Sequence, residues 1–204
     1  MNENTWNRFA SIYNVFMGKD RKVYEQMYEL IRRTVRRKNV LELATGTGLI
    51  AKNIVRDAKQ IEATDYSSKM IEIAKKSNRS SKLHFSIQDA CNLPYGENTF
   101  DVVIISNALH VMPQPEKALG EIQRVLKPEG ILIAPTFTPG QMKATKKFLA
   151  GFMAVAGFQP EHKWTSEEYM IFLMKYGWTI KKYKILNASF PLTYVECQYK
   201  EDKV

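Results

Sequence analysis

The chain is poor in cysteine and has no long apolar run. These two features argue against a disulfide-rich protein and against a membrane-spanning one. Its 204 residues include two cysteines, Cys91 and Cys197, which have neither metal-ligand spacing nor the density of a disulfide framework. The first residues lack the basic-then-apolar order of a secretory signal, and no run is long enough to span a bilayer. The three histidines also lack ligand spacing. We therefore expect a cytoplasmic protein without a metal site.

Internal repeats, low-complexity segments and long linkers are missing too, and the length fits one domain. The net charge of +9 is unevenly distributed: +5 over residues 1–39, zero over 40–137 and +4 over 138–204. Basic flanks can meet an anionic surface such as a membrane, or form a solvated face that aids solubility. Nucleic acid is a weaker candidate partner, because the arginines lack interleaved aromatic residues.

Two helical patterns fill the N-terminal part and predict a helical lid over residues 1–38. Residues 5–17 place aromatic side chains, among them Trp6, Phe9 and Tyr13, on one face. This stripe suits core packing or a lid, and secondly a peripheral membrane-surface helix. Residues 23–37 carry apolar residues on one side and arginines mostly on the other. We expect this second helix to bury its apolar side and expose its arginines.

From residue 40 the pattern alternates between strands and helices, which predicts a parallel sheet covered on both faces. The expected strands are 40–44, 60–64, 82–87, 101–106 and 130–137, and the expected helices are 48–57, 67–78 and 115–126. Helical patterns at 141–156 and 165–176 then precede two β-rich runs, 178–187 and 190–199, which predict an antiparallel pair. Residues 39–204 are thus one α/β domain, with an insertion at about 138–176.

The most informative stretch is residues 40–48, a short apolar strand that ends in glycines at a helix N-terminus. Gly46, Gly48 and Ala51 fit a G-x-G-x-x-A loop, and Asp65 follows at the end of the next expected strand. A nicotinamide-binding Rossmann domain has the same features. Glu42 differs, since a carboxylate there would repel a pyrophosphate but suits an ammonium or sulfonium group. A salt bridge to a basic neighbour is the alternative role for Glu42.

Over residues 38–137 the chain resembles the class I S-adenosylmethionine (SAM)-dependent methyltransferases. Five motifs occur in order: 42–48, 63–67, 88–91, 100–110 and 126–132. Alanine at position 44 replaces the first glycine of the first motif. The resemblance implies a Rossmann-like, doubly wound sheet of seven strands that ends in the antiparallel pair. It also implies SAM as the cofactor and S-adenosylhomocysteine as its product.

The resemblance also assigns cofactor-binding roles to residues that match the motifs. Asp65 would hold the ribose hydroxyls, and Asp89 would accept from the adenine amino group. The full implied set is Glu42, Ala44, Thr45, Gly46, Gly48, Asp65, Tyr66, Met70, Asp89, Ala90 and Asn107. Tyr66 and Met70 would lie beside the adenine, the backbone N–H of Ala90 would cap the ring, and Asn107 would contact the cofactor or support its loop.

The acceptor is less defined than the cofactor. Tyr13-Asn14 is similar to a Tyr-Asp pair in quinone and phospholipid methyltransferases, where the tyrosine folds over the methionine end of the cofactor. The acceptor could therefore be a phospholipid amine, a quinone precursor or a thiol, handled by a monomer or homodimer. A nicotinamide-dependent oxidoreductase and a non-catalytic SAM-binding protein are the alternative functions.

His110, just past the fourth expected strand, is the candidate catalytic base, because a histidine changes charge near neutral pH. An equal alternative is that His110 orients the cofactor or lines the site without moving a proton. His84, within an expected strand, is interpreted as structural. His162 and Trp164 either line the acceptor site or belong to a surface loop.

Overall fold

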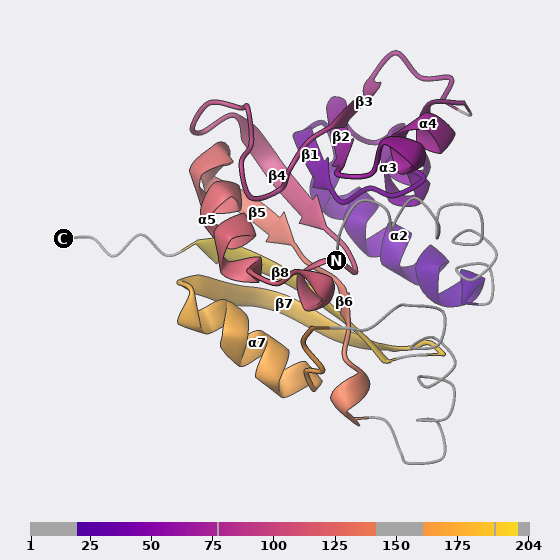
Figure 1. Ribbon diagram of the computed structural model, residues 1–204. Helices are drawn as coiled ribbons and strands as arrows, with labels where there is room; N and C mark the ends of the chain where they lie inside the picture. Colours follow the sequence, from indigo (N-terminus) through magenta and orange to yellow (C-terminus); the bar gives the residue numbers. More distant parts are fainter. Residues whose placement is uncertain (1–19, 77, 142–160, 190, 200–204) are drawn as a thin grey trace.

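A computed structural model describes residues 20–76, 78–141, 161–189 and 191–199 (Figure 1). A mostly parallel sheet forms the centre, with the pairing order β3-β2-β1-β4-β5-β8-β6 and with β7 on the other side of β8. Helices α2, α3 and α4 contribute to the apolar core on one face, and α5 and α7 to the core on the other. The predicted doubly wound α/β fold is confirmed. The strands are β1 Asn39–Leu43, β2 Gln60–Asp65, β3 Leu83–Ile87, β4 Phe100–Ile105, β5 Leu126–Ile133, β6 Thr136–Phe137, β7 Trp178–Asn187 and β8 Pro191–Tyr199, and the helices are α2 Arg21–Val35, α3 Leu49–Ile54, α4 Ser68–Lys76, α5 Pro115–Val125 and α7 Ser166–Lys175.

The sheet has eight strands in the described part of the chain, so the prediction of seven was wrong. The extra strand arises because the run after α5 is interrupted at Ala134–Pro135, which separates β5 from the two-residue β6. Both pieces pair antiparallel with β8, Ile133 opposite Glu196 and Thr136 opposite Thr193. Proline has no N–H to give to a ladder. The expected antiparallel C-terminal pair is present as β7 and β8.

The fifth strand also begins earlier than expected. The strand was expected over residues 130–137, but β5 already starts at Leu126, opposite Phe100 of β4. The register then shifts, so that Val102 pairs with Ile131. Residues 127–130 are thus accommodated as a bulge, a common way to insert extra residues into a strand.

Helix α2 packs its apolar side against the sheet, as expected from its sequence. Tyr24, Met27, Tyr28, Ile31 and Val35 are buried on that side, while Arg33, Arg36 and Arg37 at its end are exposed. The aromatic stripe at 5–17 and most of the helical pattern at 141–156 lie outside the described residues. None of the described helices is long and apolar enough to cross a membrane.

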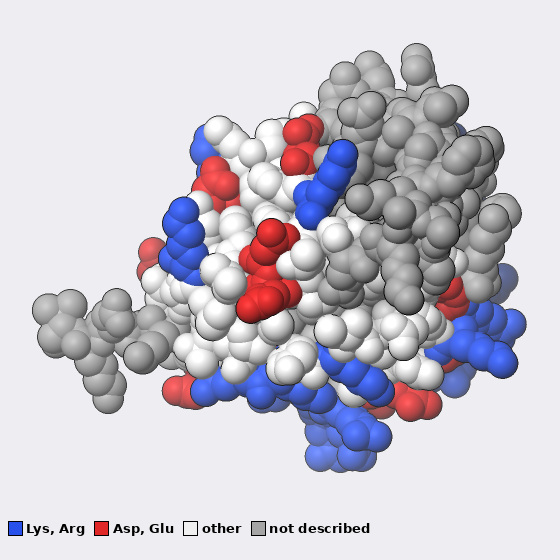
Figure 2. Space-filling model, turned by 90° about the horizontal axis from the view of Figure 1, so that it is seen from below, with Lys and Arg blue, Asp and Glu red and all other residues white. Residues whose placement is uncertain are grey.

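The charged side chains are not spread evenly over the surface. Figure 2, seen from below relative to Figure 1, shows lysines and arginines gathered along the border of that face, with fewer and scattered acidic side chains. This agrees with the overall net charge of +9.

Strands β1, β2, β3 and β4 are mutually parallel, so their carboxyl ends share one edge of the sheet. In open α/β sheets ligands bind at this edge, where the strand order reverses. The reversal here lies between β1 and β4, and the loops that follow these strands carry the residues assigned to the cofactor.

Candidate functional site

The loop between β1 and α3 brings backbone to the surface of the site. Ala44, Gly46 and Gly48 have φ values of 51°, 57° and 78°, in the left-handed region that favours glycine. A Cβ on Gly48 would lie 2.7 Å from the Phe85 ring, so a side chain there would be both strained and crowded. The absence of side chains leaves the loop open to a close-approaching ligand.

Asp65 connects the end of β2 to this loop. Its Oδ2 accepts from the backbone N–H of Gly46 at 2.7 Å, and its Oδ1 accepts from that of Ser67 at 2.8 Å. Burial raises the pKa of the carboxyl group, although these two hydrogen bonds oppose the change. Each carboxylate oxygen has two lone pairs, so both can still accept from a ribose hydroxyl. Asp65 therefore shapes the loop as well as offering acceptors to a ligand.

Glu42 is the most unusual group of the site, because only 1% of its surface is exposed. Its Oε1 accepts from the Thr45 hydroxyl at 2.7 Å, and its Oε2 has no hydrogen-bond partner among the residues that the structure describes. Burial raises the pKa of the carboxyl to about 8. In the described part of the chain Glu42 forms no salt bridge, and Lys52 Nζ donates to the Thr47 carbonyl at 2.7 Å. A buried acceptor without a partner is costly and fits a missing cationic ligand.

Asn107, just past β4, has a second unpartnered acceptor. Its φ is 52°, and its side-chain Nδ2 donates to the Tyr24 hydroxyl at 2.9 Å. Its buried Oδ1 has no hydrogen-bond partner within the described ranges. Tyr24 and Tyr28 on α2 were not assigned to the site from the sequence. A tyrosine on the buried face of a helix is usually part of the core, and only the contact with Asn107 shows otherwise. Burial and then the Glu42 charge raise the pKa of Tyr28, which places it near that carboxyl.

Exposed apolar side chains lie where the adenine is expected. Tyr66 after β2 and Ile87 at the end of β3 are each 53% exposed, and Ile87 pairs with Asp65 in the sheet. Such a surface suits a flat ring. Met70 is 2% exposed and Ala90 is buried. The exposed Asp89 uses Oδ1 to accept from the Cys91 N–H at 2.8 Å, which shapes the turn after β3.

His110 is buried at the other end of the site, with 2% of its surface exposed. Its Nδ1 lies 2.9 Å from the Thr136 hydroxyl. Burial, and secondly the neighbouring His162, lower the pKa of His110 to about 4. The ring is therefore neutral at neutral pH, and such a weak base is poorly matched to proton abstraction. This geometry favours the orienting role over the base. His84 is exposed on β3.

His162 and Trp164 lie next to His110 and form an aromatic wall. The backbone N–H of His162 donates to the backbone carbonyl of His110 at 3.0 Å. The His162 and Trp164 rings stack with centroids 4.6 Å apart and planes within 4°, and Trp164 stacks on Phe172 at 4.7 Å. The buried Nε2 of His162 has no hydrogen-bond partner in the described part of the chain.

The structure thus brings most of the predicted residues to one edge of the sheet. Hydrogen bonds join Glu42 to Thr45 and Gly46 to Asp65, and Asn107 follows the adjacent strand β4. Two acceptors without a partner among the described residues, a glycine-containing loop and an exposed apolar edge fit a zwitterionic nucleoside such as SAM better than a dinucleotide pyrophosphate. Tyr13 lies outside the described residues.

Comparison with known proteins gives the same family. Residues 41–134 match the model of a methyltransferase domain. The chain is 34% identical over 145 residues to a demethylmenaquinone methyltransferase of Thermotoga maritima, which covers 68% of this chain and 62% of that protein. It is 28% identical to the enzyme of the same name from Renibacterium salmoninarum, over 82% of this chain and 76% of that protein.

A solved structure shows the same fold over the whole chain. The methyltransferase in a complex with the Trm112 methyltransferase activator of Haloferax volcanii superposes with a TM-score of 0.82, covering 99% of both chains at 14% identity. The chain spans 39% to 48% of several other quinone methyltransferases that it matches. Fold, loop geometry and matched domain agree, and residues 41–134 form a methyltransferase domain of the class I S-adenosylmethionine-dependent type.

Proposed function

We propose that the protein transfers a methyl group from SAM to a small apolar acceptor of the quinone-precursor type. The observation that carries the proposal is a pair of buried acceptors, Glu42 Oε2 and Asn107 Oδ1, which have no partner among the described residues and lie at or just past the carboxyl ends of the neighbouring strands β1 and β4. The matched relatives named for demethylmenaquinone methylation support the acceptor class.

The binding roles follow from the contacts. Glu42 and Asn107 would take the ammonium group of SAM, Asp65 would take the ribose hydroxyls, and Tyr66 with Ile87 would cover the adenine. A neutral, buried His110 would hold its hydrogen bond to Thr136 and so define the floor of the acceptor site. The predicted lid, residues 1–38, would close over the methionine end through the Tyr24 contact with Asn107.

The aromatic wall explains why an apolar ring is favoured as acceptor. His162, Trp164 and Phe172 stack in sequence and offer flat apolar surface, while the Nε2 of His162 can accept from a hydroxyl. When bound, SAM supplies an electrophilic methyl group and leaves as the neutral S-adenosylhomocysteine. Because the leaving group is neutral, alignment in a dry site accounts for much of the rate. The hydroxyl of a quinol would give its proton to the Nε2 of His162 as its ring carbon takes the methyl group. That carbon would then lose its own proton and the oxygen would regain one, which restores the aromatic ring.

A radiolabel assay tests this function. The protein is incubated with methyl-labelled SAM and, separately, a reduced naphthoquinone, phosphatidylethanolamine vesicles or a small thiol. We expect label on the quinol ring and S-adenosylhomocysteine in equal amount. Label on the phospholipid or the thiol alone would overturn the acceptor class but keep the methyltransferase. SAM binding without transfer to any acceptor would indicate a non-catalytic SAM-binding protein.

A further inference from the structure

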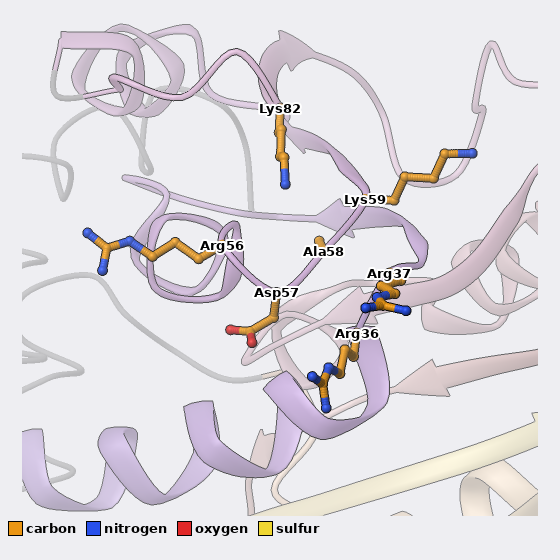
Figure 3. Close-up of a pocket in the computed structure, with 7 residues that line it drawn as sticks. All are labelled: Arg36, Arg37, Arg56, Asp57, Ala58, Lys59 and Lys82. Atoms are coloured by element: carbon orange, nitrogen blue, oxygen red, sulfur yellow. The ribbon is translucent and has the colours of Figure 1, made fainter.

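A second hollow lies at the opposite edge of the sheet from the cofactor site. Its volume is about 530 Å³, and Figure 3 shows the residues that line it. They come from the junctions where α2 leads into β1, where α3 leads into β2, and where β3 begins: Arg36, Arg37, Arg56, Asp57, Ala58, Lys59 and Lys82. Glu42 lies three residues after Asn39, the first residue of β1 at this edge, a span of about 10 Å at roughly 3.3 Å per residue.

The hollow has a large excess of positive charge. Five of its seven lining residues are cations and one is an acid, Asp57. Arg32 lies 3.9 Å from Asp57, so the single carboxylate already has a cationic neighbour outside the hollow. In the described part of the chain, none of the five lining cations forms an ion pair. Like charges held together without a counter-charge repel one another, and a bound anion would relieve this repulsion.

The backbone fixes the loops that carry these cations. The Arg37 N–H donates to the Asp57 carbonyl at 2.8 Å, and the Lys59 N–H donates to the Lys38 carbonyl at 2.9 Å. Arg37 has a φ of 59°, a conformation that favours glycine and costs an arginine about 1 kcal/mol or more. Arginine therefore occupies this position despite a backbone that disfavours it, and both Arg36 and Arg37 line the hollow (Figure 3).

The side chains surround the hollow and leave it open. Lys82 points toward the loop at 56–59, whereas Arg56 and Lys59 extend to opposite sides (Figure 3). Guanidinium groups donate in pairs to phosphate oxygens, and lysines add point charges that can swing toward an anion. The volume is large enough for more than a single phosphate group.

We propose that this hollow binds the phosphate groups of an anionic ligand, at a site separate from the SAM site. The recognising chemistry is the paired guanidinium groups of Arg36 and Arg37 with Lys82 opposite them. The proposal stands independently of the methyl-transfer reaction, since it uses no residue of the cofactor site. A free pyrophosphate-like anion and a phospholipid headgroup share this chemistry.

Two variants of equal charge test the proposal. The first replaces Arg36, Arg56 and Lys82 by glutamine, and the matched control replaces the exposed Lys117, Lys175 and Lys181 by glutamine. Inorganic pyrophosphate is titrated calorimetrically into each protein without SAM. Sedimentation with phosphatidylcholine vesicles, with and without phosphatidylglycerol, is measured in parallel. We expect the first variant to bind whichever probe the parent prefers with an affinity at least about tenfold lower. The control variant should bind that probe like the parent.

A third variant guards against loss of structure. Arg37→Gly removes a charge and also relieves the unfavourable φ, so its melting temperature should not fall while its anion affinity does. Saturable pyrophosphate binding without vesicle binding assigns a free anion, and the reverse assigns a headgroup. Equal weakening in the hollow and control variants, or no binding of either probe by the parent, overturns the proposal. Tighter binding of a single-stranded oligoribonucleotide than of both probes would replace it with a nucleic-acid surface.

Discussion

The side-chain Nδ2 of Asn107 donates to the hydroxyl of Tyr24 at 2.9 Å and so joins helix α2 to the loop after β4. Because this bond fixes the orientation of the amide, the oxygen Oδ1 points away from Tyr24, and it has no hydrogen-bond partner in the part of the chain that the structure describes. The N-terminal helix therefore determines which end of the Asn107 amide is available. The affinity for SAM should therefore depend on Tyr24, even if Tyr24 does not touch the cofactor.

Removing the Tyr24 hydroxyl tests this dependence. In Tyr24→Phe, Asn107 loses the acceptor that fixes its amide, and we expect SAM to bind about 5-fold more weakly, close to 1 kcal/mol. The same deletion at the exposed Tyr183 serves as the control. Calorimetric titration of SAM provides the measurement. Equal affinities in Tyr24→Phe and the parent would remove the helix from the cofactor site.

Glu42 should make the stability of the ligand-free protein fall as pH rises. Its native pKa of about 8 lies above the ordinary value of 4.5, so between these values the native state holds a proton that the unfolded chain has lost. Stability should therefore decline from about pH 4.5 toward pH 8, by at most about 1.4 kcal/mol per unit. Melting curves of the parent and Glu42→Gln measure this, and the glutamine variant should lack the Glu42 contribution. Parallel curves would contradict it.

Cofactor binding should show the opposite pH dependence. A cation beside Glu42 favours the carboxylate and lowers its pKa, so SAM affinity should rise with pH and level off above about pH 8. The slope should disappear in Glu42→Gln. S-adenosylhomocysteine keeps the ammonium but not the sulfonium. The same slope with this ligand would assign the contact to the ammonium, and a flat profile would assign it to the sulfonium.

Two substitutions in the β1–α3 loop should have opposite outcomes. Gly48→Ala places a Cβ 2.7 Å from the Phe85 ring at a φ of 78°. We therefore expect the free energy of unfolding to fall by about 1–3 kcal/mol and SAM to bind more weakly. Ala44→Gly removes the strain of an alanine at a φ of 51°. This gain in stability should slightly exceed the loss caused by the greater conformational entropy of glycine in the unfolded chain. Thermal melting with and without SAM measures both. Destabilisation by Ala44→Gly would show that the alanine methyl group packs usefully there.

His110 should affect the rate without shaping its pH profile. A group with a pKa of about 4 stays neutral throughout the physiological range, so it cannot produce an acidic limb near pH 6.5. We expect His110→Gln to lower kcat by less than about 100-fold, the lower limit of typical base catalysis. The pH–rate profile should keep its shape. An acidic limb that vanishes in this variant would restore His110 as the base.

Most of the fold could be predicted from the sequence, because alternating apolar runs and helical periods identify parallel strands and their helices. The β1 loop was also predictable, since few residues other than glycine fit its φ values. The eighth strand was not, because Pro135 interrupts a run that reads as one strand. Tyr24 was missed since its helical spacing equals that of a core residue. The basic hollow was missed because its cations are far apart in the sequence and meet only through the fold.

The contact between Asp20 and Ser189 has a consequence for the order of folding. Asp20 Oδ1 accepts from the Ser189 backbone N–H at 2.9 Å and from its hydroxyl at 3.0 Å, across 169 residues of sequence. Ser189 lies just before β8, which is inserted between β5 and β7 although it is the last strand made. Contacts this distant are slow to form. On the ribosome, α2 would therefore emerge long before its C-terminal support, leaving its apolar side in need of protection during synthesis.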